Sequence, residues 1–249
     1  MIILKSKRQI QRMRDAGRIT AAALAMLREQ IKPGVTTGEL DEMAFRFIRK
    51  NRGRPSFKGY RGFPASICSS VNEQIVHGIP GGRMLEPGDI VSVDLGVIYD
   101  GYQGDAAITV AVGEVDTVAQ GLIAATEAAL YAGIEQAQPG NRLGDVSAAI
   151  EKEATARGFA VVREYVGHGI GRQMHEEPPI PNFGEPGQGP LLRRGMTMAL
   201  EPMVNVGDWR TKVLPDKWTV VTADGGLSAH FEHTIAVTTN GPEILTRLK

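Results

Sequence analysis

The first fifty residues carry hydrophobic side chains at a helical period. Over residues 6–31 they recur every three or four positions, and Pro33 follows the last of them. A second run of the same period covers residues 36–53 and opens with Thr36 and Glu39, the two residues of a capping box. The pattern predicts two consecutive helices joined by a short turn.

The next strongly patterned stretch, residues 91–112, favours two strands and a tight turn. It reads VSVDLGVIYDGYQGDAAITVAV, with Asp94 and Asp105 each inside an apolar run and an Asp-Gly pair between the runs. An ionised carboxylate inside a sheet is costly unless a hydrogen bond, an opposite charge or a metal ion compensates for its lost hydration. The two aspartates therefore raise the question of what lies opposite them.

The second half of the chain repeats the helix pattern of the first. Residues 116–137 and 143–157 again have a helical period, and QPGNRLGDVS, which begins at residue 138, resembles KPGVTTGELD, which begins at residue 32. An internal repeat of this length indicates two structurally related halves. The second half differs by an insertion, which we place at residues 207–226 around its two tryptophans.

The repeat extends to the acidic residues. A glycine precedes Glu201 by six residues, as one precedes Asp94, and an isoleucine follows Glu232 by three residues, as one follows Asp105. Each half therefore carries the same pair of acids within predicted strands.

The simplest structure with this repeat is an α+β domain with an internal pseudo-twofold axis. Each half, residues 1–113 and 114–249, would supply a helix pair and antiparallel strands. The strands would join into one sheet, and both helix pairs would pack on one of its faces. No low-complexity segment or linker interrupts the sequence, so we expect residues 1–249 to form a single domain. The four acids would then face one another where the halves meet.

Composition places the chain among ordinary soluble globular proteins. Of its 249 residues, 42% are hydrophobic and 22% are charged, and 28 basic residues balance 28 acidic ones. This balance removes the electrostatic case for a nucleic acid or a membrane as the main partner. Cys68 is the only cysteine, which excludes an intramolecular disulfide and fits a reducing compartment. Neither a signal-peptide pattern nor a membrane-length apolar run is present, so we expect a cytoplasmic protein.

The four acids need positive charge between them, because neighbouring carboxylates in a sheet cannot all ionise without it. No lysine or arginine lies within the strand patterns around Asp94, Asp105 or Glu201, whereas the five histidines lie in or between these segments. In VGHGIGRQMHEEP, His168 lies in a glycine-flanked turn, and both it and His175 could point into one cleft from successive bends.

Carboxylates with one imidazole favour Mn, Fe(II) or Co(II), with Zn less suited. Four acids and a histidine are enough to hold two ions that share carboxylates and a water.

Several of these residues also have purely structural explanations. Asp100 precedes a glycine and is expected to form a turn. His233 follows Glu232, so strand alternation sends it to the opposite face of the sheet, where we expect a structural hydrogen bond. The same alternation puts His230 on the Glu232 face, near the rim. A lone Cys68 is ordinarily a small buried hydrophobe.

Five segments together resemble the methionine aminopeptidases over essentially the whole chain. They are, in order, NEQIVHGIP, DLGVIYDGYQGDAA, YVGHGIGRQMHEEP, MALEPMV and FEHTIAV. The short spacing between His168 and Glu201, without a long helical insert, resembles the bacterial type I enzymes. The resemblance implies the pita-bread fold, which has the internal twofold that the repeat indicates.

The resemblance also implies ligands for two divalent ions (Co, Mn, Fe(II) or Zn). Asp105 and Glu232 would bridge the ions, Asp94 would bind one of them, and His168 with Glu201 would complete the other. The ions would lower the pKa of a shared water and polarise the scissile carbonyl, and the free amino terminus of the substrate would bind one ion.

The implied catalytic residues are Glu201, which would accept the proton of the attacking water, His175, which would stabilise the oxyanion, and His77, which would contact the scissile amide. The implied pocket for the methionine side chain is apolar, and a tight neighbouring subsite would restrict cleavage to small second residues. The pocket positions are Tyr60, Phe63, Cys68, Met174 and Trp218. Phe63 departs from the family, where tyrosine is common, and His230 stands near an expected glutamine.

The implied substrate is the N-terminal methionine of nascent polypeptides, released by a monomer, with docking on ribosomes left open. An Xaa-Pro peptidase has a similar site but normally carries a large additional N-terminal domain that 249 residues cannot hold. Binding proteins of the same fold lose metal ligands, whereas this chain keeps every one. A metal-free hydrolase would have no use for paired acids in both halves.

Overall fold

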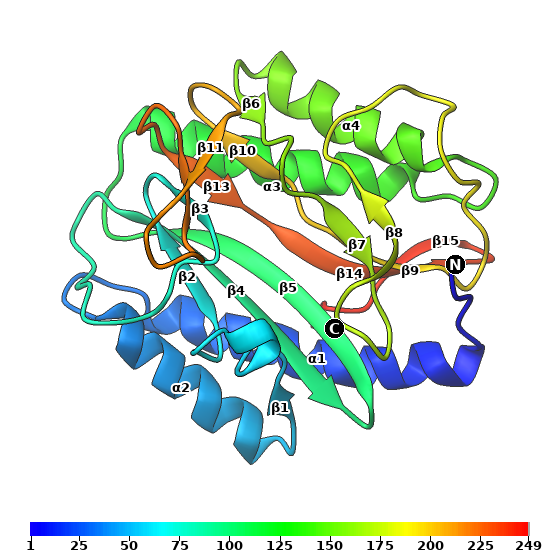
Figure 1. The fold of residues 1–249 in the computed structure, drawn as a ribbon, viewed down its shortest axis with the longest axis horizontal. Helices are drawn as coiled ribbons and strands as arrows, with labels where there is room; N and C mark the ends of the chain where they lie inside the picture. Colours follow the sequence, from blue (N-terminus) through cyan, green and yellow to red (C-terminus); the bar gives the residue numbers. More distant parts are fainter. Residues whose placement is uncertain (249) are drawn as a thin grey trace.

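The computed structural model describes residues 1–248 and contains the four helices that the sequence predicts (Figure 1). They are α1 (Lys7–Gln30), α2 (Thr37–Lys50), α3 (Thr117–Gln136) and α4 (Leu143–Ala156). Capping explains where three of them begin. The side chains of Ser6, Thr36 and Asp116 each accept a hydrogen bond from the backbone N–H three residues later. The second helix ends at Lys50, slightly before the glycine that its pattern runs to.

A nine-stranded antiparallel sheet forms the centre of the molecule. Its main order is β1 (Arg54–Pro55), β4 (Ile90–Tyr99), β5 (Tyr102–Ala111), β14 (Glu232–Thr238), β9 (Thr197–Leu200), β7 (Gly167–Gly169) and β8 (Glu176–Ile180). In addition, β2 (Cys68–Val71) pairs with β4, and β15 (Gly241–Ile244) pairs with β14. The pairing of β5 with β14 joins the first half of the chain to the second.

Two three-stranded sheets are smaller. One contains β6 (Ala160–Val161), β10 (Met203–Asn205) and β13 (Ser228–His230), and the other contains β3 (Gln74–Val76), β11 (Thr211–Val213) and β12 (Val220–Thr222). The insertion expected at residues 207–226 thus contains the β11–β12 hairpin, and it pairs with a strand from the first half.

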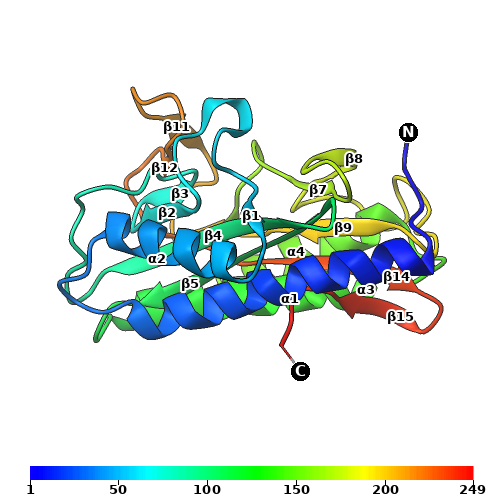
Figure 2. The ribbon, with the colours of Figure 1, turned by 90° about the horizontal axis from the view of Figure 1, so that it is seen from below.

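The helices cover one face of the large sheet, whereas the small sheet of β3, β11 and β12 lies over the other face (Figure 2). α1 packs along β4 and β5 so closely that a Cβ atom at Gly104 would lie 2.6 Å from the backbone nitrogen of Gly17. The α+β architecture with both helix pairs on one face is therefore as predicted. No helix within residues 1–248 combines the length and apolar character needed to cross a membrane.

Candidate active site

Strand register brings the predicted acids of the first half and Glu232 onto one face of the sheet. Ala107 on β5 lies opposite Asp94 on β4 and also opposite Glu232 on β14. Cys68 on β2 lies opposite Asp94 on its other side. Asp105 is two residues from Ala107, so the pleat points it to the same face, which is the one turned away from α1.

β7 and β9 bring the remaining two predicted ligands to this face. His168 and Thr234 both lie opposite Ala199 on β9, and Glu201 follows Ala199 by two residues. Nε2 of His168 is 3.5 Å from Oε1 of Glu201. His168 therefore occupies a strand rather than the glycine-flanked turn expected from its sequence, because β7 pairs with both β8 and β9.

Asp105, His168 and Glu232 form a close group of potential metal ligands. One ligand atom from each lies within 4.8 Å of the other two. Nδ1 of His168 is 3.0 Å from the carbonyl oxygen of Gly169. Because a carbonyl only accepts, this bond leaves the proton on Nδ1 and the lone pair on Nε2. A backbone bond of this kind is typical of histidines that bind a metal through the other ring nitrogen.

The acids lack the partners that buried carboxylates require. Within residues 1–248, one oxygen of each of Asp94, Asp105 and Glu232 is buried without a hydrogen-bond partner. Burial raises the pKa of Asp105 to about 7. Burial, followed by repulsion from neighbouring carboxylates, raises the pKa values of Asp94, Glu201 and Glu232 above their ordinary values. Unpartnered oxygens beside an imidazole lone pair are a donor set that fits a divalent cation.

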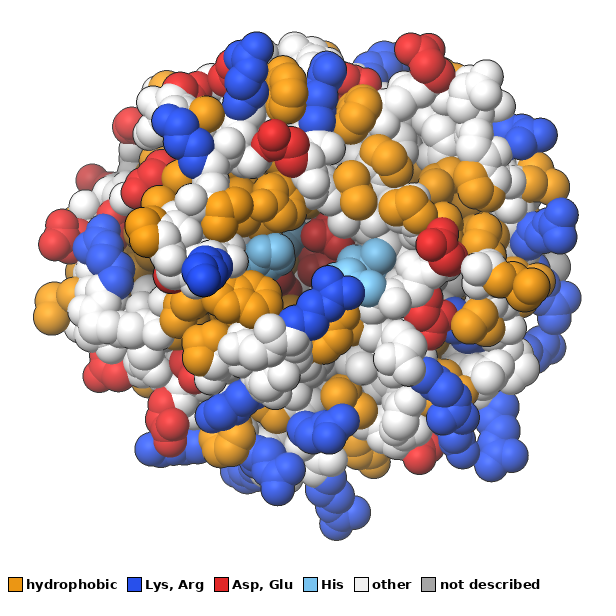
Figure 3. All heavy atoms as spheres, viewed as in Figure 1, with side chains coloured by type: hydrophobic (Ala, Val, Ile, Leu, Met, Phe, Trp, Pro, Cys, Tyr) orange, Lys and Arg blue, Asp and Glu red, His pale blue; other side chains and the backbone are white. Residues whose placement is uncertain are grey.

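Every site residue predicted from the sequence lines one cavity of about 200 Å³. Figure 3 shows a hollow on this face, with carboxylates at its floor, histidines at its sides and hydrophobic side chains around it. Residues that the sequence reasoning missed also line the cavity: Phe57, Arg61, Val76, Tyr165, Val166 and Met203. Four of them, Val76, Tyr165, Val166 and Met203, lie within the recognised segments, whereas Phe57 and Arg61 had no signal beyond closeness to Tyr60.

Aromatic rings form one wall of the cavity. The rings of Phe63 and Trp218 meet edge to face with centroids 5.1 Å apart, and Phe57 meets Phe63 in the same way at 6.5 Å. The β11–β12 hairpin carries Trp218, so the insertion supplies part of this wall. Cys68 packs beside these rings, and burial, followed by the nearby acids, raises the pKa of its thiol well above its ordinary value. The thiol is therefore neutral, as predicted for a small buried hydrophobe.

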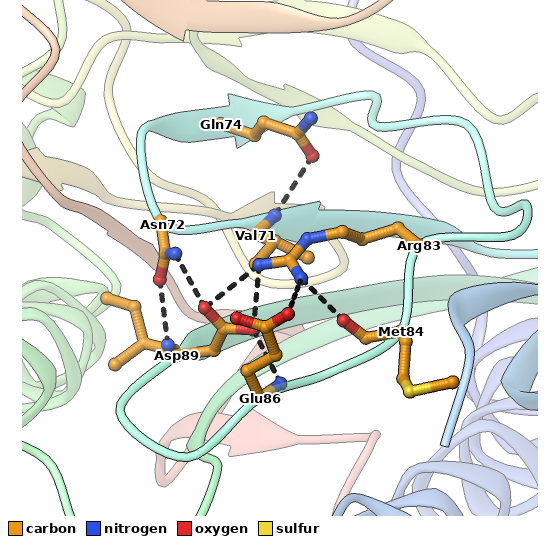
Figure 4. Close-up of polar contacts among 8 residues, drawn as sticks. Val71, Asn72, Gln74, Arg83, Met84, Glu86 and Asp89 are labelled. Atoms are coloured by element: carbon orange, nitrogen blue, oxygen red, sulfur yellow. Dashed lines mark hydrogen bonds and ion pairs between the residues drawn. The ribbon is translucent and has the colours of Figure 1, made fainter. Parts of the chain in front are cut away.

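A polar network around Asp89 fixes the turn between β2 and β3 (Figure 4). Its carboxylate accepts two hydrogen bonds from Arg83, at 2.9 and 3.0 Å, and one from Nδ2 of Asn72 at 2.8 Å. Oδ1 of Asn72 in turn accepts from the backbone N–H of Ile90 at 3.0 Å. These bonds tie the turn to the start of β4 and thereby hold β3, which leads directly into His77.

Two further histidines, His77 and His175, line the cavity beside other rings. The ring of His77 meets the rings of Tyr165 and Trp218 edge-on, with centroids 5.9 and 6.3 Å away. The ring of His175 lies 4.2 Å from that of His168. Burial, with a smaller contribution from the charge of His175, lowers the pKa of His77 to about 4, so this imidazole is neutral near pH 7.

Of the residues expected to lie outside the metal site, Asp100 and His233 are placed as predicted and His230 is not. Asp100 lies in the tight turn between β4 and β5 with a positive φ of 47°, as predicted. His233 makes the expected structural hydrogen bond, with Nδ1 2.9 Å from the hydroxyl of Thr246. The rim position expected for His230 is wrong, since only 1% of this residue is exposed. Its strand, β13, pairs with β10 and carries the ring into the interior.

Comparison with known proteins agrees with this geometry. The profile of metallopeptidase family M24 matches residues 11–239. The chain is 55% identical to a methionine aminopeptidase of Clostridium perfringens over 249 residues, with 100% of both chains covered. It is 53% identical to methionine aminopeptidase 1 of Bacillus subtilis over 248 residues, again with 100% of both covered.

Solved structures show the same relationship. The crystal structure of a methionine aminopeptidase from Thermotoga maritima superposes with a TM-score of 0.98 at 48% identity, and all of both chains is covered. The prolidase from Pyrococcus furiosus shares the fold, with a TM-score of 0.79 at 22% identity, and the match covers 99% of this chain but 66% of the prolidase. These likenesses confirm the expected pita-bread fold.

Proposed function

This chain belongs to metallopeptidase family M24, and we propose that it releases the N-terminal methionine from peptides and nascent proteins whose second residue is small. It is a metal-dependent aminopeptidase, given its full-length identity to methionine aminopeptidases. The observation that carries the mechanism is the set of buried, unpartnered carboxylate oxygens beside the Nε2 lone pair of His168.

Five residues would hold two divalent ions in this site. Asp105 and Glu232 are assigned to both ions, Asp94 to one, and His168 with Glu201 to the other. The ions would be Co, Mn, Fe(II) or Zn, and when bound they would lower the pKa of a water between them and polarise the scissile carbonyl. The support is the donor set: four carboxylates with raised pKa values next to a neutral imidazole.

The protein's own side chains would carry the proton and orient the peptide. The carboxylate of Glu201 would take the proton of the attacking water and pass it on towards the leaving nitrogen. His175 would donate to the oxyanion that develops on the carbonyl oxygen, and His77 would contact the scissile amide. Both imidazoles line the cavity above the acids, and burial lowers the pKa of each.

The aromatic wall would receive the methionine side chain. Tyr60, Phe63, Cys68, Met174 and Trp218 line the cavity beside the carboxylates. An unbranched thioether packs favourably against aromatic edges, and the neutral thiol of Cys68 adds no charge to the pocket. The limited cavity volume, about 200 Å³, supports the restriction to small second residues.

We place this activity in the cytoplasm, in a monomer that forms one catalytic domain over residues 1–249. Nascent polypeptides would be its substrates, met at the ribosome or after release. Because basic and acidic residues balance at 28 each, we assign no nucleic-acid or membrane partner.

The deciding experiment is hydrolysis of Met-Ala-Ser by chelator-stripped protein with and without Mn(II) or Co(II). We expect the metal to restore release of free methionine, and we expect no release from N-acetylated Met-Ala-Ser. Hydrolysis of Ala-Pro instead would assign the chain to Xaa-Pro peptidases. Bound ions without hydrolysis of any peptide would make it a binding protein of the same fold.

A further inference from the structure

The hydroxyl group of Tyr60 lies 2.8 Å from Nδ1 of His175, and the two rings stack with centroids 5.5 Å apart at 22°. We propose that Tyr60 is a positioning residue: its hydroxyl donates to Nδ1 of His175 and keeps the imidazole proton on Nε2, the atom that would donate to the oxyanion. This inference rests on the proposed function, because it concerns the role given there to His175.

Chemistry sets the direction of this hydrogen bond. A phenol is a stronger acid than a neutral imidazole N–H, and the imidazole lone pair is a better acceptor than a phenol oxygen. Within residues 1–248, the Tyr60 hydroxyl forms its hydrogen bond with Nδ1 of His175. Donation from Tyr60 therefore gives the stronger bond, whereas the reverse direction would leave the phenol proton without a protein acceptor.

The neighbouring histidine shows the opposite arrangement. Nδ1 of His168 donates to the carbonyl of Gly169, which leaves a lone pair on Nε2. The ring of His175 is only 4.2 Å away, and Tyr60 leaves a proton on its Nε2. Two adjacent imidazoles would thus be held in different tautomers, one that can bind a cation and one that can donate to substrate.

The local backbone holds Tyr60 in place for this contact. The 3-10 turn η1 (Tyr60–Gly62) is closed by hydrogen bonds from Gly59 N–H to the Phe63 carbonyl at 2.8 Å and from Phe63 N–H to the Tyr60 carbonyl at 2.9 Å. Gly59 and Gly62 have positive φ values of 84° and 91°, which a glycine adopts at little cost.

Arg61, in the same turn, packs against the Tyr60 ring. Its guanidinium lies 5.4 Å from the centre of the Tyr60 ring. The cation therefore packs on the ring whose hydroxyl meets Nδ1 of His175.

The test compares Tyr60→Phe with wild type, since this change removes only the hydroxyl and leaves the stacked ring. We expect kcat for Met-Ala-Ser to fall about 10–100-fold, the range for residues that orient a catalytic ligand, with KM and bound metal unchanged. Tyr131→Phe is the matched control. Its ring also lies against a histidine, His233, at 6.0 Å, but on α3 outside the cavity, so kcat should not change.

A double-mutant cycle and a spectroscopic measurement separate positioning from pocket packing. In the His175→Ala background, Tyr60→Phe should cause no further loss, because the residue through which it acts is gone. In ¹⁵N-histidine NMR of the Zn(II)-loaded enzyme, the His175 signals, assigned by their loss in His175→Asn, should show Nε2 protonated in wild type and a tautomer mixture in Tyr60→Phe.

Three results would overturn the proposal: unchanged kcat in Tyr60→Phe, a rise in KM alone, or the same fold-loss in both backgrounds. A wild-type enzyme that releases no methionine with any metal would remove the proposed function instead. In that case the NMR measurement, which needs no turnover, still decides whether Tyr60 sets the tautomer.

Discussion

The ammonium group of Lys5 donates to the carboxylate of Glu176 in a buried ion pair, with only 4% and 7% of the two side chains exposed. The other oxygen of Glu176 accepts from the backbone N–H groups of Arg172 and Gln173, at 2.9 and 3.2 Å. The pair therefore connects the segment before α1 to the turn that ends in His175. The buried carboxylate thus contributes to the shape of this turn, beside a backbone hydrogen bond from Gly171 N–H to the Gln173 carbonyl at 3.1 Å.

Lys5→Met should destabilise the protein strongly. It leaves the Glu176 carboxylate buried without its cation, which costs about 3–5 kcal/mol of unfolding free energy for a broken buried pair. Urea unfolding measures this loss, and kcat should fall with it because the turn before His175 loosens. The control Lys7→Met alters an exposed lysine and should change neither. Adding Glu176→Gln to Lys5→Met should recover stability, and a double variant no more stable than Lys5→Met would contradict this account.

Asp105→Ala and His77→Ala should separate metal binding from substrate contact. Asp105 belongs to the close ligand group with His168 and Glu232, so its loss should abolish both bound metal, measured by elemental analysis, and activity. His77→Ala should leave the metal content intact and lower the rate. Asp100→Asn is the control, because Asp100 lies in an exposed turn with a positive φ that asparagine tolerates. Full turnover by Asp105→Ala would refute its assignment to both ions.

Local signals account for what the sequence predicted. The helix bounds follow from periodicity and caps such as Ser6 and Thr36, which act within one turn of the chain. The acids were found because each half carries a pair at the same spacing, and pleat parity then placed His233 correctly on the opposite face.

The errors and omissions involve contacts between distant segments. The burial of His230 depends on β10 pairing with β13, and the strand position of His168 depends on β9, neither of which leaves a local pattern. Tyr60 was assigned to an apolar wall, yet its hydroxyl reaches a residue 115 positions later. The Lys5 and Glu176 pair spans 171 positions. Such partners become visible only after the sheet has assembled.

Gly104→Ala should destabilise the α1–β5 interface. A Cβ atom there would lie 2.6 Å from the backbone nitrogen of Gly17 and 2.7 Å from its Cα, so helix and strand must move apart. Overpacking against rigid backbone costs roughly 1–3 kcal/mol, which chemical denaturation can measure. Gly82→Ala, where an added Cβ meets nothing within 4 Å, should stay close to wild type. Equal stability of the two variants would show that α1 is free to shift.

The metal-free protein should become less stable as the pH rises from about 7 to about 8. Unfolded carboxyls have pKa values near 3.8 and 4.5 and are fully ionised in this range, whereas in the folded protein burial raises the pKa values of Asp94, Asp105, Glu201 and Glu232. Asp105, whose folded pKa is about 7, therefore binds a proton in the folded state that it lacks in the unfolded state, and raising the pH through 7 removes that proton from the folded state alone. The buried histidines do not offset this effect. Their pKa values are 6.5 in the unfolded protein and about 3 to 4 in the folded protein, so both lie below the window. These histidines are His77, His168, His230 and His233.

Thermal unfolding of chelator-stripped and Mn(II)-loaded protein at both pH values measures this effect. We expect the melting temperature of the stripped protein to fall by several degrees while that of the loaded protein falls less, because cations compensate the ionised acids. Asp105→Asn should flatten the pH dependence of the stripped protein, since it removes the group whose folded pKa of about 7 lies in this window. A melting temperature that rises with pH in the stripped protein, or an equal fall with and without Mn(II), would show that Asp105 does not carry this linkage.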